Sequence, residues 1–279
     1  MNGSFFSRFE VNPISGGSIN NTFKLKDENG RLFFCKNNSA TLFPQLFEKE
    51  ASGLQLIASY SVIKVPQVLQ LHIDNDEQFL VLEWIESGNK TETFWKRFGE
   101  GLARLHRINN NYYGLETDNY MGSIPQQNTA QNTWTTFYWK QRLMPLIIQC
   151  RQQNLLAQKH EALFQKLARK LSSIFNEQEK PALVHGDLWS GNFMCSTTEE
   201  PYLIDPAIYF GHRSIDLGMT TLFGGFHPLF YEAYHYHYPF PANHKEQWNV
   251  CNLYPLLIHL LLFGKGYLPQ IENTLRYFE

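Results

Sequence analysis

The sequence lacks the features that mark membrane proteins and nucleic-acid-binding proteins. Its 279 residues contain no run of about 18 apolar residues, and the polar N-terminal stretch has no apolar centre of a signal peptide. The formal net charge is only −2, which gives no electrostatic reason to bind nucleic acid or a membrane surface. The hydrophobic content of 43% is ample for a packed core. We therefore expect a cytoplasmic globular protein with neither kind of partner.

Cysteine is scarce as well. The four cysteines lie far apart and form no C-x-x-C pair, which favours isolated buried thiols over disulfides or a zinc site. Cys35 is the exception to keep open, because the charge of the adjacent Lys36 could lower the pKa of its thiol. The stretch 231–238 is rich in Tyr and His but has no regular ligand spacing, so we interpret it as packing rather than a metal site.

The most informative segment is HGDLWSGN at residues 185–192, which is followed by IDP at residues 204–206. This segment places the carboxylate of Asp187 five residues before the amide of Asn192. A second carboxylate, that of Asp205, follows after a short hydrophobic run. An aspartate in a tight loop can accept a proton from an attacking hydroxyl, while an Asn and an Asp can hold metal ions beside the transferring phosphate. This pattern predicts a kinase that uses ATP and Mg²⁺, with Asp187 as catalytic base and Asn192 and Asp205 as metal ligands.

The differences from the protein-kinase signature are informative too. Gly186 stands where protein kinases have arginine before the catalytic Asp, and Pro206 stands where they have phenylalanine after the metal-binding Asp. This exchange points to small-molecule kinases, as in the aminoglycoside and choline kinase group.

Further motifs extend this pattern over nearly the whole chain. They are Gly16-Gly17-Ser18-Ile19-Asn20, GSIPQQN at 122–128, QRLMP at 141–145, DPA at 205–207, GHR at 211–213 and LFGGF at 222–226. Together with the HGDLWSGN segment, they resemble the fructosamine kinase (ketosamine-3-kinase) family. The resemblance implies phosphorylation of the sugar 3-hydroxyl of a ketosamine, the rearranged adduct of a sugar with an amine or a protein lysine. Such a reaction would repair glycation.

The predicted fold is α+β, a bilobal protein-kinase-like fold. Short β-rich runs at 9–14, 22–26, 31–36, 68–73 and 79–84, with a hairpin signal at Asn29-Gly30, predict an antiparallel five-stranded sheet. One helix is expected at 44–59. These elements form the N-lobe, residues 1–85. Residues 86–279 form a larger, mainly helical C-lobe, with helices expected at 92–109, 134–151, 152–176, 253–263 and 271–277.

The N-lobe holds the expected nucleotide contacts. The loop containing Gly16, Gly17, Ser18 and Asn20 lies between the first two strands, where backbone N–H groups could approach phosphate oxygens closely. Its alternative is an ordinary glycine-rich turn, which the downstream motifs disfavour.

Two further contacts are predicted by analogy with kinases. Lys36 is expected to pair with Glu50 on the following helix and to hold the phosphates. Glu48 competes for this role, but it lies about 160° around the helix from Glu50, and Glu50 precedes the inward-packing segment. The backbone of Glu83-Trp84-Ile85, where the chain crosses between the lobes, is expected to bind adenine.

The remaining candidates surround the acceptor. Trp189 offers a flat face on which a sugar could stack, or else packs under the loop. His212 and Arg213 are assigned to substrate binding, with anchoring of the catalytic loop as the alternative. Asp216 is expected to accept backbone hydrogen bonds from that loop, and His106 is interpreted as a core histidine.

Two other functions stay open from the sequence. One is a kinase of the aminoglycoside or choline type, and the other is a non-catalytic nucleotide-binding protein. The residues decide neither the oligomeric state nor whether the ketosamine is free or protein-bound.

Overall fold

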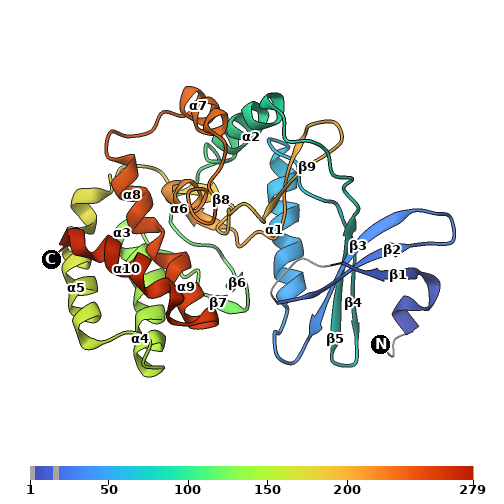
Figure 1. The fold of residues 1–279 in the computed structure, drawn as a ribbon, viewed down its shortest axis with the longest axis horizontal. Helices are drawn as coiled ribbons and strands as arrows, with labels where there is room; N and C mark the ends of the chain where they lie inside the picture. Colours follow the sequence, from blue (N-terminus) through green and yellow to red (C-terminus); the bar gives the residue numbers. More distant parts are fainter. Residues whose placement is uncertain (1–3, 15–18, 279) are drawn as a thin grey trace.

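The computed structural model of the protein describes residues 4–14 and 19–278. It has two lobes (Figure 1): a β-sheet lobe with one long helix, which contains the N-terminus, and a larger helical lobe, which contains the C-terminus. The predicted α+β, bilobal architecture is confirmed. Within the described ranges, no helix is long and apolar enough to span a bilayer.

The smaller lobe is built on one antiparallel sheet with the strand order β1-β2-β3-β5-β4. Its strands are β1 (Glu10–Pro13), β2 (Asn21–Lys26), β3 (Leu32–Ser39), β4 (Val68–Asp74) and β5 (Glu77–Glu83). A 3-10 helix, η1 (Ser4–Arg8), precedes the sheet, and α1 (Leu46–Tyr60) follows β3. All five strands lie close to their predicted positions.

Alternation along β5 explains how both faces of this sheet are covered. Leu80 and Leu82 belong to the apolar cluster around α1. Phe79 and Val81 point to the opposite face, where they pack with Phe5 of η1. Because successive side chains of a strand point to opposite faces, one buried strand holds both layers together.

The larger lobe consists mainly of helices with short two-stranded antiparallel sheets between them. Their strands are β6 (Asn119–Met121), β7 (Ile124–Gln126), β8 (Ala182–Val184), β9 (Phe193–Cys195), β10 (Pro201–Leu203) and β11 (Tyr209–Gly211), and β6 pairs with β7, β9 with β10 and β8 with β11. The helices are α2 (Glu92–Leu105), α3 (Trp134–Phe137), the π-helix η2 (Tyr138–Leu143), α4 (Met144–Gln152), α5 (Gln158–Ile174), α6 (Ser214–Met219), α7 (Pro228–His237), α8 (His244–Cys251), α9 (Leu253–Phe263), η3 (Lys265–Tyr267), α10 (Leu268–Leu275) and η4 (Arg276–Phe278).

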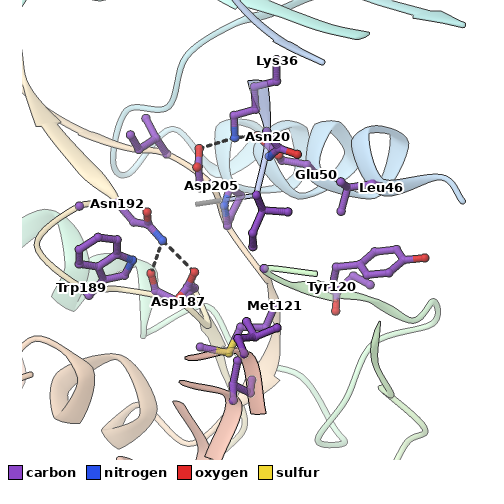
Figure 2. A pocket seen from close by; sticks show the side chains of 18 of the residues that line it. Asn20, Lys36, Leu46, Glu50, Tyr120, Met121, Asp187, Trp189, Asn192 and Asp205 are labelled. Atoms are coloured by element: carbon purple, nitrogen blue, oxygen red, sulfur yellow. Dashed lines mark hydrogen bonds and ion pairs between the residues drawn. The ribbon is translucent and has the colours of Figure 1, made fainter. Parts of the chain in front are cut away.

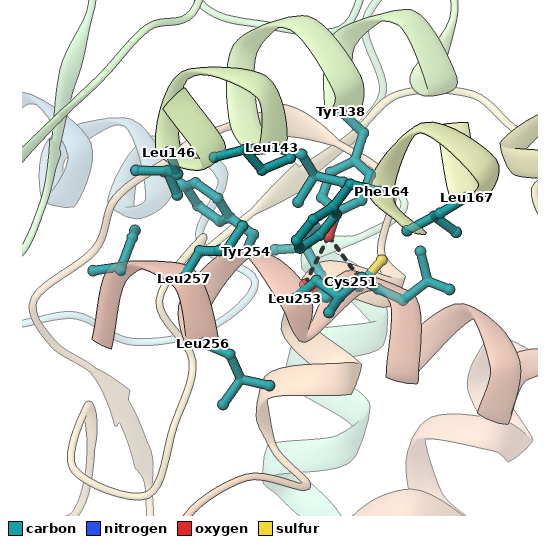
Figure 3. Close-up of a cluster of buried hydrophobic side chains, with 14 of the residues drawn as sticks. Tyr138, Leu143, Leu146, Phe164, Leu167, Cys251, Leu253, Tyr254, Leu256 and Leu257 are labelled. Carbon is teal, nitrogen blue, oxygen red and sulfur yellow. Dashed lines mark hydrogen bonds between the residues drawn. The ribbon is translucent and has the colours of Figure 1, made fainter. Parts of the chain in front are cut away.

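The core of this lobe joins η2, α4, α5 and α9 (Figure 3). Tyr138 is fully buried there, and its hydroxyl donates to the carbonyl of Val250, 2.7 Å away. This bond satisfies the polar end of a large aromatic side chain that otherwise contributes apolar contact. Leu143, Phe164 and Leu257 fill the space around it.

The structure corrects several predicted helix bounds. The helix predicted over 92–109 ends at Leu105, and the one predicted over 152–176 begins only at Gln158. Helices α6, α7 and α8 were not predicted, because they are only 6, 10 and 8 residues long. The prediction of isolated thiols is confirmed, since all four cysteines are free and buried. Burial raises the pKa of the Cys35 thiol to about 12, so Lys36 does not activate it.

Candidate active site

Lys36 lies at the centre of an ion-pair cluster between the lobes. Its ammonium is 2.8 Å from a carboxylate oxygen of Glu50 and 2.6 Å from one of Asp205. Burial opposes the charge of Lys36, but the two carboxylates outweigh it and raise the pKa of the lysine above its usual range. The predicted pairing with Glu50, rather than Glu48, is confirmed. Asp205 joins the pair from the other lobe.

The loop after β8 holds Asp187 in a fixed position. Gly186 adopts φ +83°, and a Cβ atom at this position would lie 2.1 Å from the carbonyl oxygen of Ala207. Glycine is therefore required by both backbone conformation and space. Burial and the neighbouring Asp205 raise the pKa of Asp187 to about 7, while the amide of Asn192 opposes this shift by donating to its carboxylate at 2.9 Å.

Asp216 holds the same loop in place through hydrogen bonds to its backbone. Its two carboxylate oxygens accept hydrogen bonds from the backbone N–H groups of His185 (2.7 Å) and Gly186 (2.8 Å). His106 lies 3.0 Å from Asp216 through Nε2 and 2.8 Å from the hydroxyl of Tyr234 through Nδ1. Both ring nitrogens of this fully buried histidine thus have partners. The predictions for Asp216 as the clamp and His106 as a core residue are confirmed.

A cavity of about 780 Å³ opens beside these groups, between the two lobes. Figure 2 shows Lys36 and Glu50 at one end, with Asp187, Asn192 and Asp205 close by and Trp189 along the wall. Predicted site residues that line it are Asn20, Lys36, Glu50, Asp187, Trp189, Asn192 and Asp205. Residues separated by most of the chain therefore meet in one cavity.

The donor set in this cavity fits a hard divalent cation. Asn192 uses its amide nitrogen to donate to Asp187, which leaves the amide oxygen without a partner among the described residues. Asp205 pairs with Lys36 through one oxygen only, and its side chain is 41% exposed. Oxygen ligands of this kind suit Mg²⁺, which binds one or two protein groups and fills its other positions with phosphate and water. In the described ranges no cluster of three His, Cys, Asp or Glu forms a separate metal site.

An aromatic wall was missed by the sequence reasoning. Phe223, His259, Phe263 and Tyr267 line the cavity together with Trp189. They come from the LFGGF motif and from the end of α9 with η3. The LFGGF motif was noted only as part of the resemblance, and the segment of α9 was predicted only as a helix. Phe223 has φ +52°, a strained left-handed value for an aromatic residue, which was a signal only the structure could supply.

The structure corrects the predicted role of His212 and Arg213 in substrate binding. Neither side chain lines the cavity, because both turn toward Glu179 in the helical lobe. Arg213 Nε donates to Glu179 at 2.7 Å, and its other nitrogens donate to the carbonyls of Tyr238 and Pro239. Their assignment to substrate binding was therefore wrong. Instead, they connect the segment after α7 with the loop before β8.

The other residues predicted to contact the nucleotide lie either outside the described residues or away from the cavity lining. Gly16, Gly17 and Ser18 lie outside the described residues. Glu83 ends β5, and Trp84 and Ile85 follow it; none of the three lines the cavity. The indole N–H of Trp84 donates to Glu86, so any adenine contact by this segment depends on its backbone.

Comparisons with known proteins agree with this geometry. The fructosamine kinase family model matches residues 1–278. A "Probable ketoamine kinase" of Synechocystis sp. is 37% identical over 268 residues, 96% of this chain and 89% of the relative. The "Protein-ribulosamine 3-kinase, chloroplastic" of Arabidopsis thaliana is 33% identical over 92% of this chain and 79% of its own.

A solved structure is similar over the same extent. The crystal structure of a "Putative fructosamine-3-kinase" from Haemophilus somnus superposes with a TM-score of 0.88 at 25% identity, covering 96% of this chain and 90% of the other. The fold and the site define a kinase-like protein with a small-molecule cleft. The chain belongs to the fructosamine kinase family.

Proposed function

We propose that this protein transfers the γ-phosphoryl group of ATP to the 3-hydroxyl of ketosamines, such as ribulosamine or fructosamine adducts. Membership of the fructosamine kinase family supports this reaction, as do relatives named ketoamine kinase and protein-ribulosamine 3-kinase. The observation that carries it is the convergence of Lys36, Asp187, Asn192 and Asp205 on one cavity. These are the groups that phosphoryl transfer from a metal–nucleotide complex needs.

Asp187 acts as the base in this proposal. The acceptor hydroxyl donates its proton to the Asp187 carboxylate while its oxygen bonds to the γ-phosphorus, and the bond from that phosphorus to the ADP oxygen breaks. The amide of Asn192 holds one oxygen of Asp187 at 2.9 Å, which orients the other toward the acceptor. A carboxyl pKa of about 7 suits a base that must take up a proton at neutral pH.

Lys36 and the metal ligands bind the nucleotide. Lys36 is held by Glu50 and contacts the phosphates as a fixed positive charge. Asn192 and Asp205 would hold Mg²⁺, which when bound neutralises charge on the phosphate oxygens. We also assign phosphate contacts to the loop with Gly16, Gly17, Ser18 and Asn20, and adenine contacts to the backbone of Glu83-Trp84-Ile85. The cytoplasmic location expected from the sequence belongs to the same proposal, supported by four unpaired thiols.

Trp189 supports the sugar in this arrangement. Its ring packs over Gly191 and also lines the cavity beside Asp187, so it both shapes the loop and offers a face for stacking. We expect Trp189→Ala to raise the KM for the ketosamine while sparing the KM for ATP.

An acceptor panel tests the function directly. The enzyme with Mg·ATP is given the ketoamine of a single lysine, a ribulosamine, choline and an aminoglycoside, and ADP release is measured with mass spectrometry of the products. We expect phosphorylation of the two ketosamines alone. Robust phosphorylation of the aminoglycoside or of choline with none of the ketosamines would contradict the proposed acceptor and leave a small-molecule kinase of another type. Absence of ATP turnover with every acceptor would favour a nucleotide-binding protein without catalysis.

A further inference from the structure

A chain of aromatic rings leads from the catalytic end of the cavity toward its outer end. The centroids of Trp189 and Phe223 are 6.2 Å apart in an edge-to-face arrangement, and those of Phe223 and His259 are 4.8 Å apart. His259 in turn lies 5.0 Å from Tyr267 and 5.4 Å from Phe263. All five rings line the same cavity. The wall next to the catalytic loop is therefore continuous with an apolar surface on α9 and η3.

His259 adds one polar group to this surface. Its Nδ1 lies 2.7 Å from the carbonyl oxygen of Pro255, one turn earlier in α9. A carbonyl only accepts, so Nδ1 carries the proton, and the neutral ring presents Nε2 as an acceptor. Burial lowers the pKa of His259, which favours this neutral form. Nε2 has no hydrogen-bond partner among the described residues, so its lone pair is available to a ligand in the cavity.

The distribution of charge in the cavity is uneven. Its acidic lining residues, Glu50, Asp187 and Asp205, gather with Lys36 at the catalytic end. The other charged side chain that lines the described part of the cavity is Lys49, a cation. Phe263 is 52% exposed, so the far end of the wall meets solvent. A ligand group there meets aromatic faces without a carboxylate.

We propose that Phe223, His259, Phe263 and Tyr267 form the subsite for the amine portion of the acceptor and select apolar, uncharged substituents over cationic ones. The inference rests on the proposed function, because it assumes that the sugar hydroxyl meets Asp187. With the sugar over Trp189, the substituent on its amine extends along the ring chain. The amine N–H donates to Nε2 of His259. A terminal ammonium is disfavoured relative to an alkyl end because it stays hydrated at the exposed end of the wall and keeps the last methylene groups from packing against the rings.

Three ketosamines of the same sugar test this subsite with the intact enzyme and Mg·ATP. Their amines are methylamine, hexylamine and 1,6-diaminohexane, so the second and third match in length and differ in a terminal charge. We expect kcat/KM for the hexylamine adduct to exceed that for the methylamine adduct by at least about tenfold, because the alkyl chain buries apolar surface. The diamine adduct should lose most of this gain. Equal values for all three adducts would overturn the subsite and leave the proposed function standing.

Variants of the wall provide a second measurement. Phe263→Ala and Tyr267→Ala should each reduce the ratio of kcat/KM between the hexylamine and methylamine adducts at least about threefold. Tyr236→Ala is the matched control, since Tyr236 is an 83% exposed aromatic on α7 that does not line the cavity, and its ratio should equal that of the parent. An unchanged ratio in both wall variants would overturn the inference. If no adduct is phosphorylated although another acceptor is, the proposed function fails with it.

Discussion

The ammonium of Lys36 and the carboxylate of Asp205 lie 2.6 Å apart, although 169 residues separate them in the chain. Lys36 projects from β3 of the sheet lobe, and Asp205 follows β10 in the helical lobe. Asp205 adopts φ +56°, a left-handed conformation that is uncommon for a residue with a side chain. The local backbone strain therefore coincides with a contact between the lobes. Because Glu50 holds the same ammonium, this contact couples the sheet, α1 and the segment that contains Asp205.

Lys36→Met tests how much this cluster contributes to stability. The change leaves Glu50 without a partner at a site where its side chain is only 11% exposed, and it also releases Asp205. We expect a loss of about 2–4 kcal/mol in the free energy of unfolding, because an unpaired buried charge is costly. Urea unfolding at pH 7 measures it. Lys96→Met, which breaks an exposed pair with Glu92, is the control and should cost less than about 0.5 kcal/mol. Similar losses in the two variants would contradict a structural role for the cluster.

Asp187→Asn tests the catalytic base. The amide cannot accept the proton of the acceptor hydroxyl, so we expect turnover to fall by ~10²–10⁴-fold. The affinity for Mg·ATP should stay nearly the same, because the proposed nucleotide contacts are made by other residues. Steady-state kinetics with a ketosamine and calorimetric titration with Mg·ATP give the two values. A variant that kept more than about a tenth of the parent rate would be incompatible with general-base catalysis.

Asp205→Ala and Asn192→Ala test the metal ligands. A carboxylate contributes a full charge to Mg²⁺ and an amide only a dipole, so the affinity for Mg·ATP should fall further in Asp205→Ala. Calorimetric titration of each variant with ATP, with and without Mg²⁺, separates metal-dependent binding from binding of the nucleotide alone. Equal losses in the two variants would mean that the roles of the two residues are wrongly assigned.

The sequence contained enough to predict the architecture and the meeting of Lys36, Glu50, Asp187, Asn192 and Asp205 in one place. Strand periodicity and the Asn29-Gly30 turn are local signals, and they predicted the sheet. Asp187 and Asn192 belong to one loop, and Asp205 follows the short hairpin that comes after it. The three residues are close in the sequence, so the motif predicted that they lie close together in the fold. The choice of Glu50 over Glu48 followed from helix geometry and the inward packing of the next turn, and the structure agrees.

The rest depended on tertiary packing. His212 and Arg213 follow β11 directly, and nothing in the local sequence showed that both turn toward Glu179, more than 30 residues earlier in the chain. His259 lies on an apolar helix, so its sequence neighbours alone predict a residue of the hydrophobic core. Its place in the cavity wall depends on how α9 meets the LFGGF loop, a contact between distant segments that periodicity does not encode.

The Glu179 carboxylate makes the stability of the helical lobe depend on pH. Burial favours its neutral form, but the adjacent His212 and Arg213 outweigh this and lower its pKa from 4.5 to about 2. A lowered pKa stabilises the fold fully above the unfolded value of about 4.5, and the contribution is lost as the pH falls toward 2.

We expect the free energy of unfolding of the parent to fall more steeply between pH 5 and pH 3 than that of Glu179→Gln, by roughly 2–3 kcal/mol over the full titration. Denaturant unfolding at several pH values measures both slopes. Glu92→Gln, at an exposed site, should keep the slope of the parent. Parallel curves for Glu179→Gln and the parent would rule out this contribution.

Gly186→Ala tests whether the catalytic loop needs the close approach of its backbone to Ala207. Gly30, in the turn between β2 and β3, has a nearly identical φ of +79°, but no atom lies within 4 Å of the place that an alanine methyl group would take. Gly30→Ala therefore measures the backbone cost alone, which should be about 1 kcal/mol. At Gly186 the methyl group would also collide with the Ala207 carbonyl, and we expect a total loss of at least about 3 kcal/mol in the free energy of unfolding. Thermal and urea unfolding of the two variants measure the difference, and equal losses would show that the loop relaxes without cost.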